Sequence, residues 1–270
     1  MNQIDEIYLG LCKQLLNAPK VAGTRELNNV KLTIDNIGQA PGDNIVSVRG
    51  ISPSYLMGEL LWYFTGRNDL QFISAFAKKW EQVSDDGETC NSAYGYIMKN
   101  KFPFNQISQV VNILKHDPNS RRAIINLNTP HLNRLKTKDE PCTIALQFYI
   151  RDGKLNCTGI MRSNDIWTGF PYDVAFFTEL QKYIACRLNI LCGSYTHFAT
   201  SLHMYDRNLD AVLDMVENSM SKPISFNFDK FHEHKYYVAQ LIEVASNHCS
   251  REYVKDFTLK LAKEQFDFKY

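Results

Sequence analysis

The chain has 270 residues, of which 44% are hydrophobic and 12% aromatic, so it is long enough for one large domain with a sizeable core. Its 30 Lys and Arg balance 29 Asp and Glu, which leaves no strong field to attract a nucleic acid or a membrane surface. The seven cysteines are scattered and form no Cys-x-x-Cys pair, as in a reduced, cytoplasmic protein. The sequence has neither a signal-like N-terminus nor an apolar run of transmembrane length. We therefore predict a single cytoplasmic domain over residues 1–270 that does not bind a nucleic acid or a membrane.

The first informative element is a helix predicted to begin at Ser52-Pro53. Ser52 is a capping residue, Pro53 suits the first turn, and Gly66 is placed to end the helix. Glu59 is the only formally charged side chain in this apolar stretch, so the helix should be buried. A buried carboxylate either pairs with other groups or has a chemical role, and the sequence weighs these two readings equally.

A short predicted strand over residues 123–128 follows, with Arg121 and Arg122 in front of it. Taken alone, this arginine pair is most simply a solvated start to the strand. The next strand, over residues 143–150, alternates and places Ile144, Leu146, Phe148 and Ile150 on one face.

The pair Asp152-Gly153 predicts a two-residue hairpin turn after that strand. Counting outward from this turn places Cys142 opposite Ser163 and beside Arg162. A single cysteine is more often a small core residue than a nucleophile. A neighbouring guanidinium reverses that preference, because a cation favours the nucleophilic thiolate.

The remaining predicted elements complete a mixed pattern. Pro171 opens a helix with Asp173 in its first turn, where acidic residues are common, and a polar-aromatic segment carries His203 and Tyr205. This order favours an α/β (α+β) fold around a large mixed sheet rather than regular strand-helix alternation. His232 and His234 lack further ligands at metal-site spacing, so no metal is predicted.

Several motifs in order along most of the chain resemble the thymidylate synthase family. They are Glu59, Tyr94-Gly95, Arg121-Arg122, Pro141-Cys142, Arg162-Ser163-Asn164-Asp165, Gly169-Phe170-Pro171-Tyr172-Asp173 and His203-Met204-Tyr205. The resemblance implies a thymidylate synthase-like fold, in which helices flank a large twisted mixed sheet. A face of that sheet would form a homodimer interface. It also implies methylenetetrahydrofolate as the cofactor and a nucleotide monophosphate as the substrate.

The same resemblance assigns roles to individual residues. Cys142 would add to C6 of a pyrimidine, Glu59 would handle protons through ordered water, and Asp173 would read the base. The other substrate-binding residues would be Arg162 and Ser163 at the phosphate, Arg121 and Arg122 from the partner subunit, His203 and Tyr205 at the sugar, and Tyr94. The folate side would comprise Trp80, Asp165 and Gly169.

Asp173 departs from the family pattern, because thymidylate synthases have an asparagine there that reads N3-H and O4 of uracil. An ionised carboxylate only accepts hydrogen bonds, so it favours the N4 amino group of cytosine. This chain is thus similar to the deoxycytidylate hydroxymethylase branch, where water captures the methylene carried to C5. Thr143, Met161 and the C-terminal sequence Gln-Phe-Asp-Phe-Lys-Tyr also differ from thymidylate synthases. The main prediction is folate-dependent 5-hydroxymethylation of a cytidine monophosphate.

Other functions stay open at this point. The chain could methylate dCMP, act as a thymidylate synthase on dUMP, or bind nucleotides without catalysis. A Cys-His hydrolase using Cys142 and His203 is disfavoured because no strand-turn-helix elbow surrounds the cysteine. His203 and Tyr205 would bond a 3'-hydroxyl that ribose and deoxyribose share. Either Lys20 or Arg25 could replace an expected phosphate-binding arginine.

Overall fold

The computed structural model describes residues 2–38, 42–129 and 135–218. Its helices are α1 (Gln3–Leu16), α2 (Pro53–Phe64), α3 (Leu70–Ser74), α4 (Trp80–Val83), α5 (Tyr94–Lys99), α6 (Gln106–His116), α7 (Phe170–Leu188) and α8 (Leu209–Asn218), with a 3-10 helix η1 (Asp206–Asn208). Its strands are β1 (Lys20–Val21), β2 (Thr24–Ile34), β3 (Ile124–Asn126), β4 (Thr143–Arg151), β5 (Lys154–Met161), β6 (Asn164–Asp165) and β7 (Leu191–Tyr205). None of the described helices is both long and apolar enough to cross a membrane.

Contacts divide the chain into two compact units, each assembled from separate segments. Among the described residues, the first unit comprises 2–38, 42–51, 106–128 and 142–218, and the second comprises 52–105, 129 and 135–141. The first unit therefore holds the sheet and the predicted nucleophile, and the second holds the predicted proton-handling carboxylate. The expectation of one domain over residues 1–270 stays a prediction.

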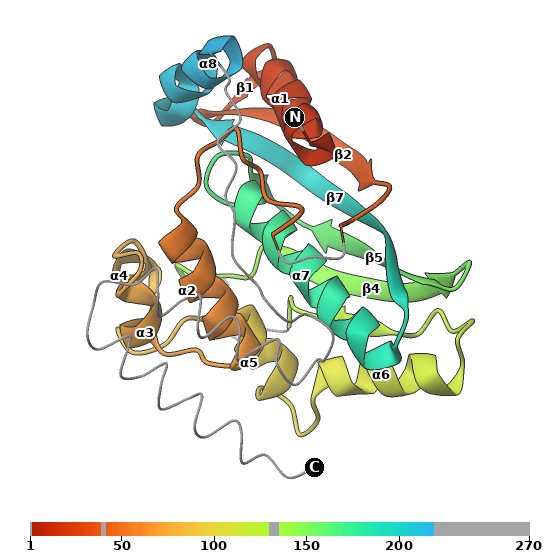
Figure 1. Ribbon diagram of the computed structural model, residues 1–270. Helices are drawn as coiled ribbons and strands as arrows, with labels where there is room; N and C mark the ends of the chain where they lie inside the picture. The colour runs from red at the N-terminus through yellow and green to blue at the C-terminus, as the bar shows by residue number, and fades with distance from the viewer. Residues whose placement is uncertain (1, 39–41, 130–134, 219–270) are drawn as a thin grey trace. The chain divides into compact units, whose positions relative to one another are not determined.

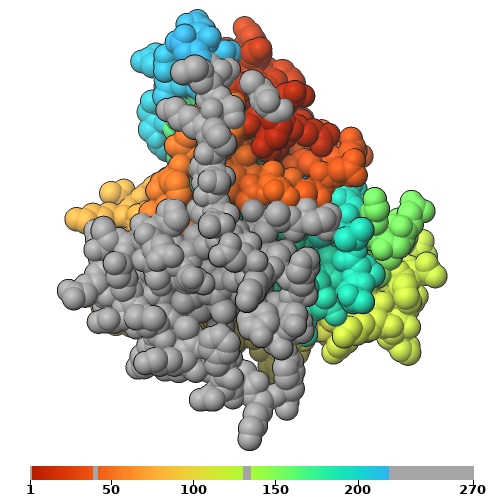
Figure 2. All heavy atoms as spheres, viewed as in Figure 1, coloured from red at the N-terminus to blue at the C-terminus, as the bar shows by residue number. Residues whose placement is uncertain are grey.

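The first unit is built on a mixed sheet, as the sequence predicts. Its described strands lie in the order β1-β2-β7-β5-β4-β3, with β6 pairing to β7 (Figure 1). Strands β5 and β6 both run parallel to β7, whereas the other strand pairs are antiparallel. Helix α7 precedes β7 in the chain and packs against β5 and β7. Helix α1 packs on β2, and its atoms lie beside those of α8 (Figure 2).

The predicted hairpin between β4 and β5 forms with its predicted turn. Asp152 and Gly153 both have positive φ, 52° and 70°, as a type I' turn requires. The predicted register holds from Arg151 back to Ala145, and then a bulge at Ile144 shifts it. Ile144 is consequently 39% exposed, so the prediction that it shares the buried face of Leu146 and Phe148 is wrong.

The second unit is built around α2, which begins and ends where the sequence predicts. The Ser52 hydroxyl accepts from the Tyr55 amide at the N-terminus, and Gly66 follows the helix with a φ of 72°. Nine residues of α2, Leu56 to Phe64, are buried, so the prediction of a buried helix is confirmed.

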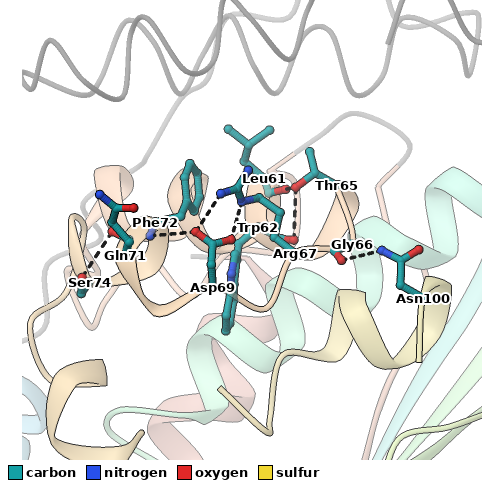
Figure 3. Close-up of polar contacts among 10 residues, drawn as sticks. All are labelled: Leu61, Trp62, Thr65, Gly66, Arg67, Asp69, Gln71, Phe72, Ser74 and Asn100. Carbon is teal, nitrogen blue, oxygen red and sulfur yellow. Dashed lines mark hydrogen bonds and ion pairs between the residues drawn. The ribbon is translucent and has the colours of Figure 1, made fainter. Parts of the chain in front are cut away.

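Local polar contacts fix the chain immediately after α2 (Figure 3). The Thr65 hydroxyl donates to the Leu61 carbonyl at 2.7 Å, and the Asn100 amide donates to the Gly66 carbonyl at 2.7 Å. Arg67 donates twice to the Asp69 carboxylate, which also caps α3. This paired geometry anchors the C-terminal end of α2, the helix that carries Glu59.

Candidate active site

The predicted nucleophile and its cation meet at the ends of β4 and β5. Nη2 of Arg162 lies 3.8 Å from Sγ of Cys142, and the Arg162 amide donates to the Cys142 carbonyl at 2.9 Å. The bulge makes Arg162, and not Ser163, the backbone partner of Cys142, which corrects the predicted register by one residue. Cys142 is half-buried beside an exposed guanidinium. An adjacent cation favours the thiolate, so this contact suits a nucleophile.

The paired arginines lie elsewhere on the same sheet. Arg121 and Arg122 are exposed in front of β3, and the Gln147 amide donates to the Arg121 carbonyl at 2.9 Å. Gln147 is five residues along β4 from Cys142, about 16 Å at the rise of a strand. The fold of one chain therefore does not bring these two arginines to Cys142. Their donation from a partner subunit stays a prediction.

The predicted base reader belongs to a chain of hydrogen bonds that enters the core. Nδ2 of Asn164 donates to Oδ2 of Asp173 at 2.7 Å, and Oδ1 of Asn164 lies 3.1 Å from Nε2 of His197. Nδ1 of His197 lies 2.8 Å from the Tyr195 hydroxyl. Because Asn164 presents its oxygen to His197, Nε2 must donate, Nδ1 must accept, and the Tyr195 hydroxyl must donate. Every bond in this chain thus runs toward Asp173.

Burial determines the charge states of the side chains in this series of hydrogen bonds. His197 is 1% exposed, and desolvation lowers its pKa to about 3, so the imidazole is neutral around pH 7. Burial also raises the pKa of Tyr195 well above its ordinary value. Both side chains therefore act as neutral hydrogen-bonding groups. Within this series of hydrogen bonds, Asp173 is the group that can carry charge.

The predicted sugar-binding and folate-binding residues share one strand pairing. In the register of β6 with β7, Asp165 pairs with His203, and the His203 and Tyr205 rings make an edge contact at 5.2 Å. Burial lowers the pKa of His203, while Asp165 and Glu26 act to raise it. Oδ1 of Asp165 accepts from the Trp167 amide at 2.9 Å, and its other oxygen accepts from the Thr168 hydroxyl.

Gly169 borders the same group of residues. A Cβ at this position would lie 3.1 Å from Nδ2 of Asn164, 3.3 Å from the Asp165 carbonyl oxygen and 3.3 Å from Oδ2 of Asp173. Glycine therefore keeps the space beside the Asn164–Asp173 contact clear of a side chain.

In the second unit, Glu59 is the centre of an aromatic and hydroxyl cluster. Its Oε1 accepts from the Tyr55 hydroxyl at 2.6 Å and from the Tyr63 hydroxyl at 3.5 Å. Nε1 of Trp80 donates to the Tyr55 oxygen at 3.2 Å, and the Tyr94 ring stacks on Tyr63 with centroids 5.2 Å apart. The fold thus joins three predicted site residues, Glu59, Trp80 and Tyr94.

Desolvation dominates the electrostatics of Glu59. Burial raises its pKa from 4.5 to about 7, although the hydroxyls of Tyr55 and Tyr63 act in the opposite direction. A carboxyl group that titrates near neutrality can both accept and release a proton under cellular conditions. Glu59 is therefore suited to general acid-base chemistry.

The contacts of Lys20 and Arg25 do not show which of them would bind the phosphate. Lys20 forms an exposed ion pair with Asp206 at 3.7 Å, and Nη1 of Arg25 donates to the Leu16 carbonyl at 2.7 Å. No cluster of three or more His, Cys, Asp or Glu that could hold a metal occurs in the described ranges. His232, His234 and the C-terminal hexapeptide lie outside the described residues.

Sequence reasoning gave Tyr55 no role beside Glu59, and it missed His197 and Tyr195. The alternation along β7, where Tyr195, His197 and Ala199 are buried and their neighbours are not, is visible only in the structure. A histidine in the buried phase of a strand needs partners for both ring nitrogens. Once its burial is known, that requirement directs attention to His197.

Comparison with known protein families matches residues 6–259 to thymidylate synthase. The chain belongs to the thymidylate synthase family. Membership accounts for the order of the motifs along the sequence and agrees with the mixed sheet and its helices. It also confirms the resemblance from which the roles of Cys142, Glu59 and Asp173 were inferred. Members of the thymidylate synthase family use methylenetetrahydrofolate.

Two curated phage proteins are similar to part of this chain. A deoxyuridylate hydroxymethyltransferase of Bacillus phage SP01 is 33% identical over 170 residues, 58% of this chain and 44% of that protein. A deoxyuridylate hydroxymethyltransferase of Pseudomonas phage M6 is 31% identical over 180 residues, 64% of this chain and 51% of that protein. The chain thus spans about half the length of these relatives. Their names point to deoxyuridylate, not to the deoxycytidylate branch that the sequence predicts.

Proposed function

We propose that this protein transfers a one-carbon unit from methylenetetrahydrofolate to C5 of deoxyuridylate and leaves it there as a hydroxymethyl group. The observation that carries the proposal is the contact between Cys142 and Arg162, the two residues that the resemblance assigns as nucleophile and phosphate ligand. The names of the two phage relatives support deoxyuridylate as the nucleotide and hydroxymethylation as the outcome.

Cys142 and Glu59 would carry the bond-making steps. The Cys142 thiolate forms a bond to C6, and the electron pair of the C5–C6 double bond moves to C5, which becomes the nucleophile toward the one-carbon unit. Glu59, with a pKa raised to about 7, would move protons to and from the nucleotide through ordered water. Loss of the C5 proton and departure of Cys142 restore the double bond and the free thiolate.

The predicted folate residues have chemistry that fits the cofactor. Asp165 offers a half-buried carboxylate to the N–H groups of a pterin, Gly169 leaves adjacent space, and Trp80 offers a half-buried aromatic ring. When bound, methylenetetrahydrofolate supplies a carbon at the oxidation level of formaldehyde. Addition of water to that carbon needs no hydride, so tetrahydrofolate and not dihydrofolate is the expected by-product. Thr143 and Met161, both fully buried next to Cys142 and Arg162, are the departures we associate with water capture.

Nucleotide binding would use both charge and hydrogen bonds. Arg162 and Ser163 would hold the 5'-phosphate together with Arg121 and Arg122 of a second copy, and His203 and Tyr205 would bond the sugar. The required homodimer would form through the sheet face opposite α7, where the described side chains are half-exposed. That face includes Thr158, Ile160, Thr196 and Phe198.

Deoxycytidylate is the second candidate substrate, and Asp173 is the observation in its favour. A carboxylate alone matches the N4 amino group of cytosine and leaves O4 of uracil without a donor. Methyl transfer to either nucleotide would differ in forming dihydrofolate.

Product analysis tests the proposal directly. Purified protein is mixed with methylenetetrahydrofolate and an equimolar pool of dUMP, dCMP, UMP and CMP, and the nucleotides are identified by mass spectrometry. The expected product is dUMP carrying one additional formaldehyde unit, with the Cys142→Ser variant forming none. Hydroxymethylated dCMP would replace the proposed substrate, a methylated nucleotide would replace the proposed reaction, and an unchanged pool would refute catalysis.

A further inference from the structure

The amide of Asn164 lies where it can supply the hydrogen-bond donor that Asp173 lacks. One hydrogen of Nδ2 bonds to Oδ2 of Asp173 at 2.7 Å, and no acceptor for the second hydrogen exists in the described part of the chain. Asn164 is only 2% exposed, and a buried amide hydrogen without an acceptor is costly. Asp173, in turn, is a carboxylate, and a carboxylate offers about four lone-pair positions.

The surroundings hold this amide in one orientation. A carboxylate only accepts, so Asp173 holds Nδ2 of Asn164 toward itself, and Oδ1 then faces Nε2 of His197. A flipped amide would place its NH2 group against Nε2–H of His197, two donors facing each other. Gly169 leaves the adjacent space clear, since a Cβ there would lie 3.1 Å from Nδ2 of Asn164 and 3.3 Å from Oδ2 of Asp173.

We propose that Asn164 and Asp173 read the pyrimidine as a pair, with His197 and Tyr195 as positioning residues that keep the Asn164 donor directed to the base. The inference rests on the proposed deoxyuridylate substrate, and for uracil the assignment is unique. The carboxylate can only accept, so Asp173 takes N3–H, and the NH2 group can only donate, so Asn164 bonds O4. Cytosine in the same pose would set its N4 amino group against the Asn164 NH2 and its N3 lone pair against the carboxylate.

Two variants test the pair, one at the base and one remote from it. Asn164→Asp replaces the donor with an acceptor, which suits the N4 amino group of cytosine and repels O4 of uracil. Tyr195→Phe removes the first donor of the chain, so His197 can protonate Nδ1 and the Asn164 amide can turn. Thr178→Val is the matched control, because it also removes one buried hydroxyl, on α7, that bonds only local carbonyls.

The readout is the ratio of the dissociation constants for dUMP and dCMP, measured by calorimetry, which needs no turnover. We expect the wild type and Thr178→Val to prefer dUMP. Each mismatched buried group changes affinity by about 10- to 100-fold, so Asn164→Asp should reverse the preference. Tyr195→Phe should reduce it by about tenfold.

An unchanged ratio in Asn164→Asp would overturn the proposal, and so would a wild type that prefers dCMP. If Asn164→Asp does not fold, an unchanged ratio in Tyr195→Phe overturns it instead. The proposed reaction is judged separately, by the hydroxymethylated product of the wild type. A wild type that makes no product but prefers dUMP, together with an Asn164→Asp variant that prefers dCMP, would refute the reaction and support the reading pair.

Discussion

Substitution of Glu59 by glutamine should stabilise the protein and flatten the pH dependence of its stability. Burial raises the pKa of Glu59 from 4.5 to about 7, which means that the folded state favours the protonated carboxyl. Below the unfolded-state pKa both states are protonated and the group has no effect on stability. As pH rises through the interval from about 4.5 to 7, the unfolded state ionises first, and the folded state loses stability relative to it.

The magnitude follows from the two pKa values. At 1.36 kcal/mol for each pKa unit, Glu59 lowers the free energy of unfolding by about 1 kcal/mol at pH 5 and about 3 kcal/mol at pH 8. Glutamine keeps an oxygen that can accept from Tyr55 and Tyr63, and it cannot ionise. The Glu59→Gln variant should therefore exceed the wild type in stability by about 3 kcal/mol at pH 8 and by much less at pH 5.

Urea unfolding followed by tryptophan fluorescence measures this difference at the two pH values. Trp62 and Trp80 lie in the same unit as Glu59 and report on its unfolding. Glu88→Gln is the matched control, because Glu88 is exposed in that unit and its replacement should leave the wild-type pH dependence unchanged. A stability difference between Glu59→Gln and wild type that is equal at pH 5 and pH 8 would refute the assignment of desolvation as the dominant cause.

Three further predictions concern the nucleophile, the subunits and the packing. Arg162→Gln should slow covalent adduct formation between Cys142 and a 5-fluorinated deoxyuridylate by about tenfold or more, measured by intact-protein mass spectrometry, because a neutral amide does not favour the thiolate; an unchanged rate would contradict this. The Cys142→Ser variant and the Arg121→Ala/Arg122→Ala variant, each inactive alone, should regain about a quarter of wild-type activity when their subunits are mixed. Half of the dimers would then be mixed, and one of the two sites in each would be intact; no recovery would argue against shared sites. Gly95→Ala should lower the melting temperature, because its Cβ would lie 2.0 Å from the Tyr63 carbonyl oxygen; an unchanged melting temperature would show that α2 and α5 can separate at no cost.

The sequence predicts the elements whose signals are local. Ser52, Pro53 and Gly66 mark the ends of α2 because capping and positive φ depend on a few adjacent residues. The Asp152-Gly153 turn is predictable for the same reason, and it carries most of the β4–β5 register with it.

Features that depend on contacts distant in sequence were not predictable. The bulge at Ile144 follows from pairing with a third strand, since the amides of Leu127 and Asn128 both donate to the Ile144 carbonyl. The bond between Asn164 and Asp173 also requires β6 and α7 to be in place. Asp173 was therefore read without Asn164, because the residue order does not show that the two side chains meet.

The bulge at Ile144 also determines which face of the sheet the side chain of the nucleophile lies on. In an uninterrupted strand, Cys142 would share the inward face of Leu146 and Phe148, and its thiol would be one more apolar group of the core. With one additional residue in β4, Thr143 occupies the inward position and is fully buried, whereas Cys142 is half-buried beside Arg162. Loss of the register shift at Ile144, with the chain length unchanged, would turn the thiol inward without altering any residue of the site. The chemistry at this position thus depends on the register of a strand as well as on its side chains.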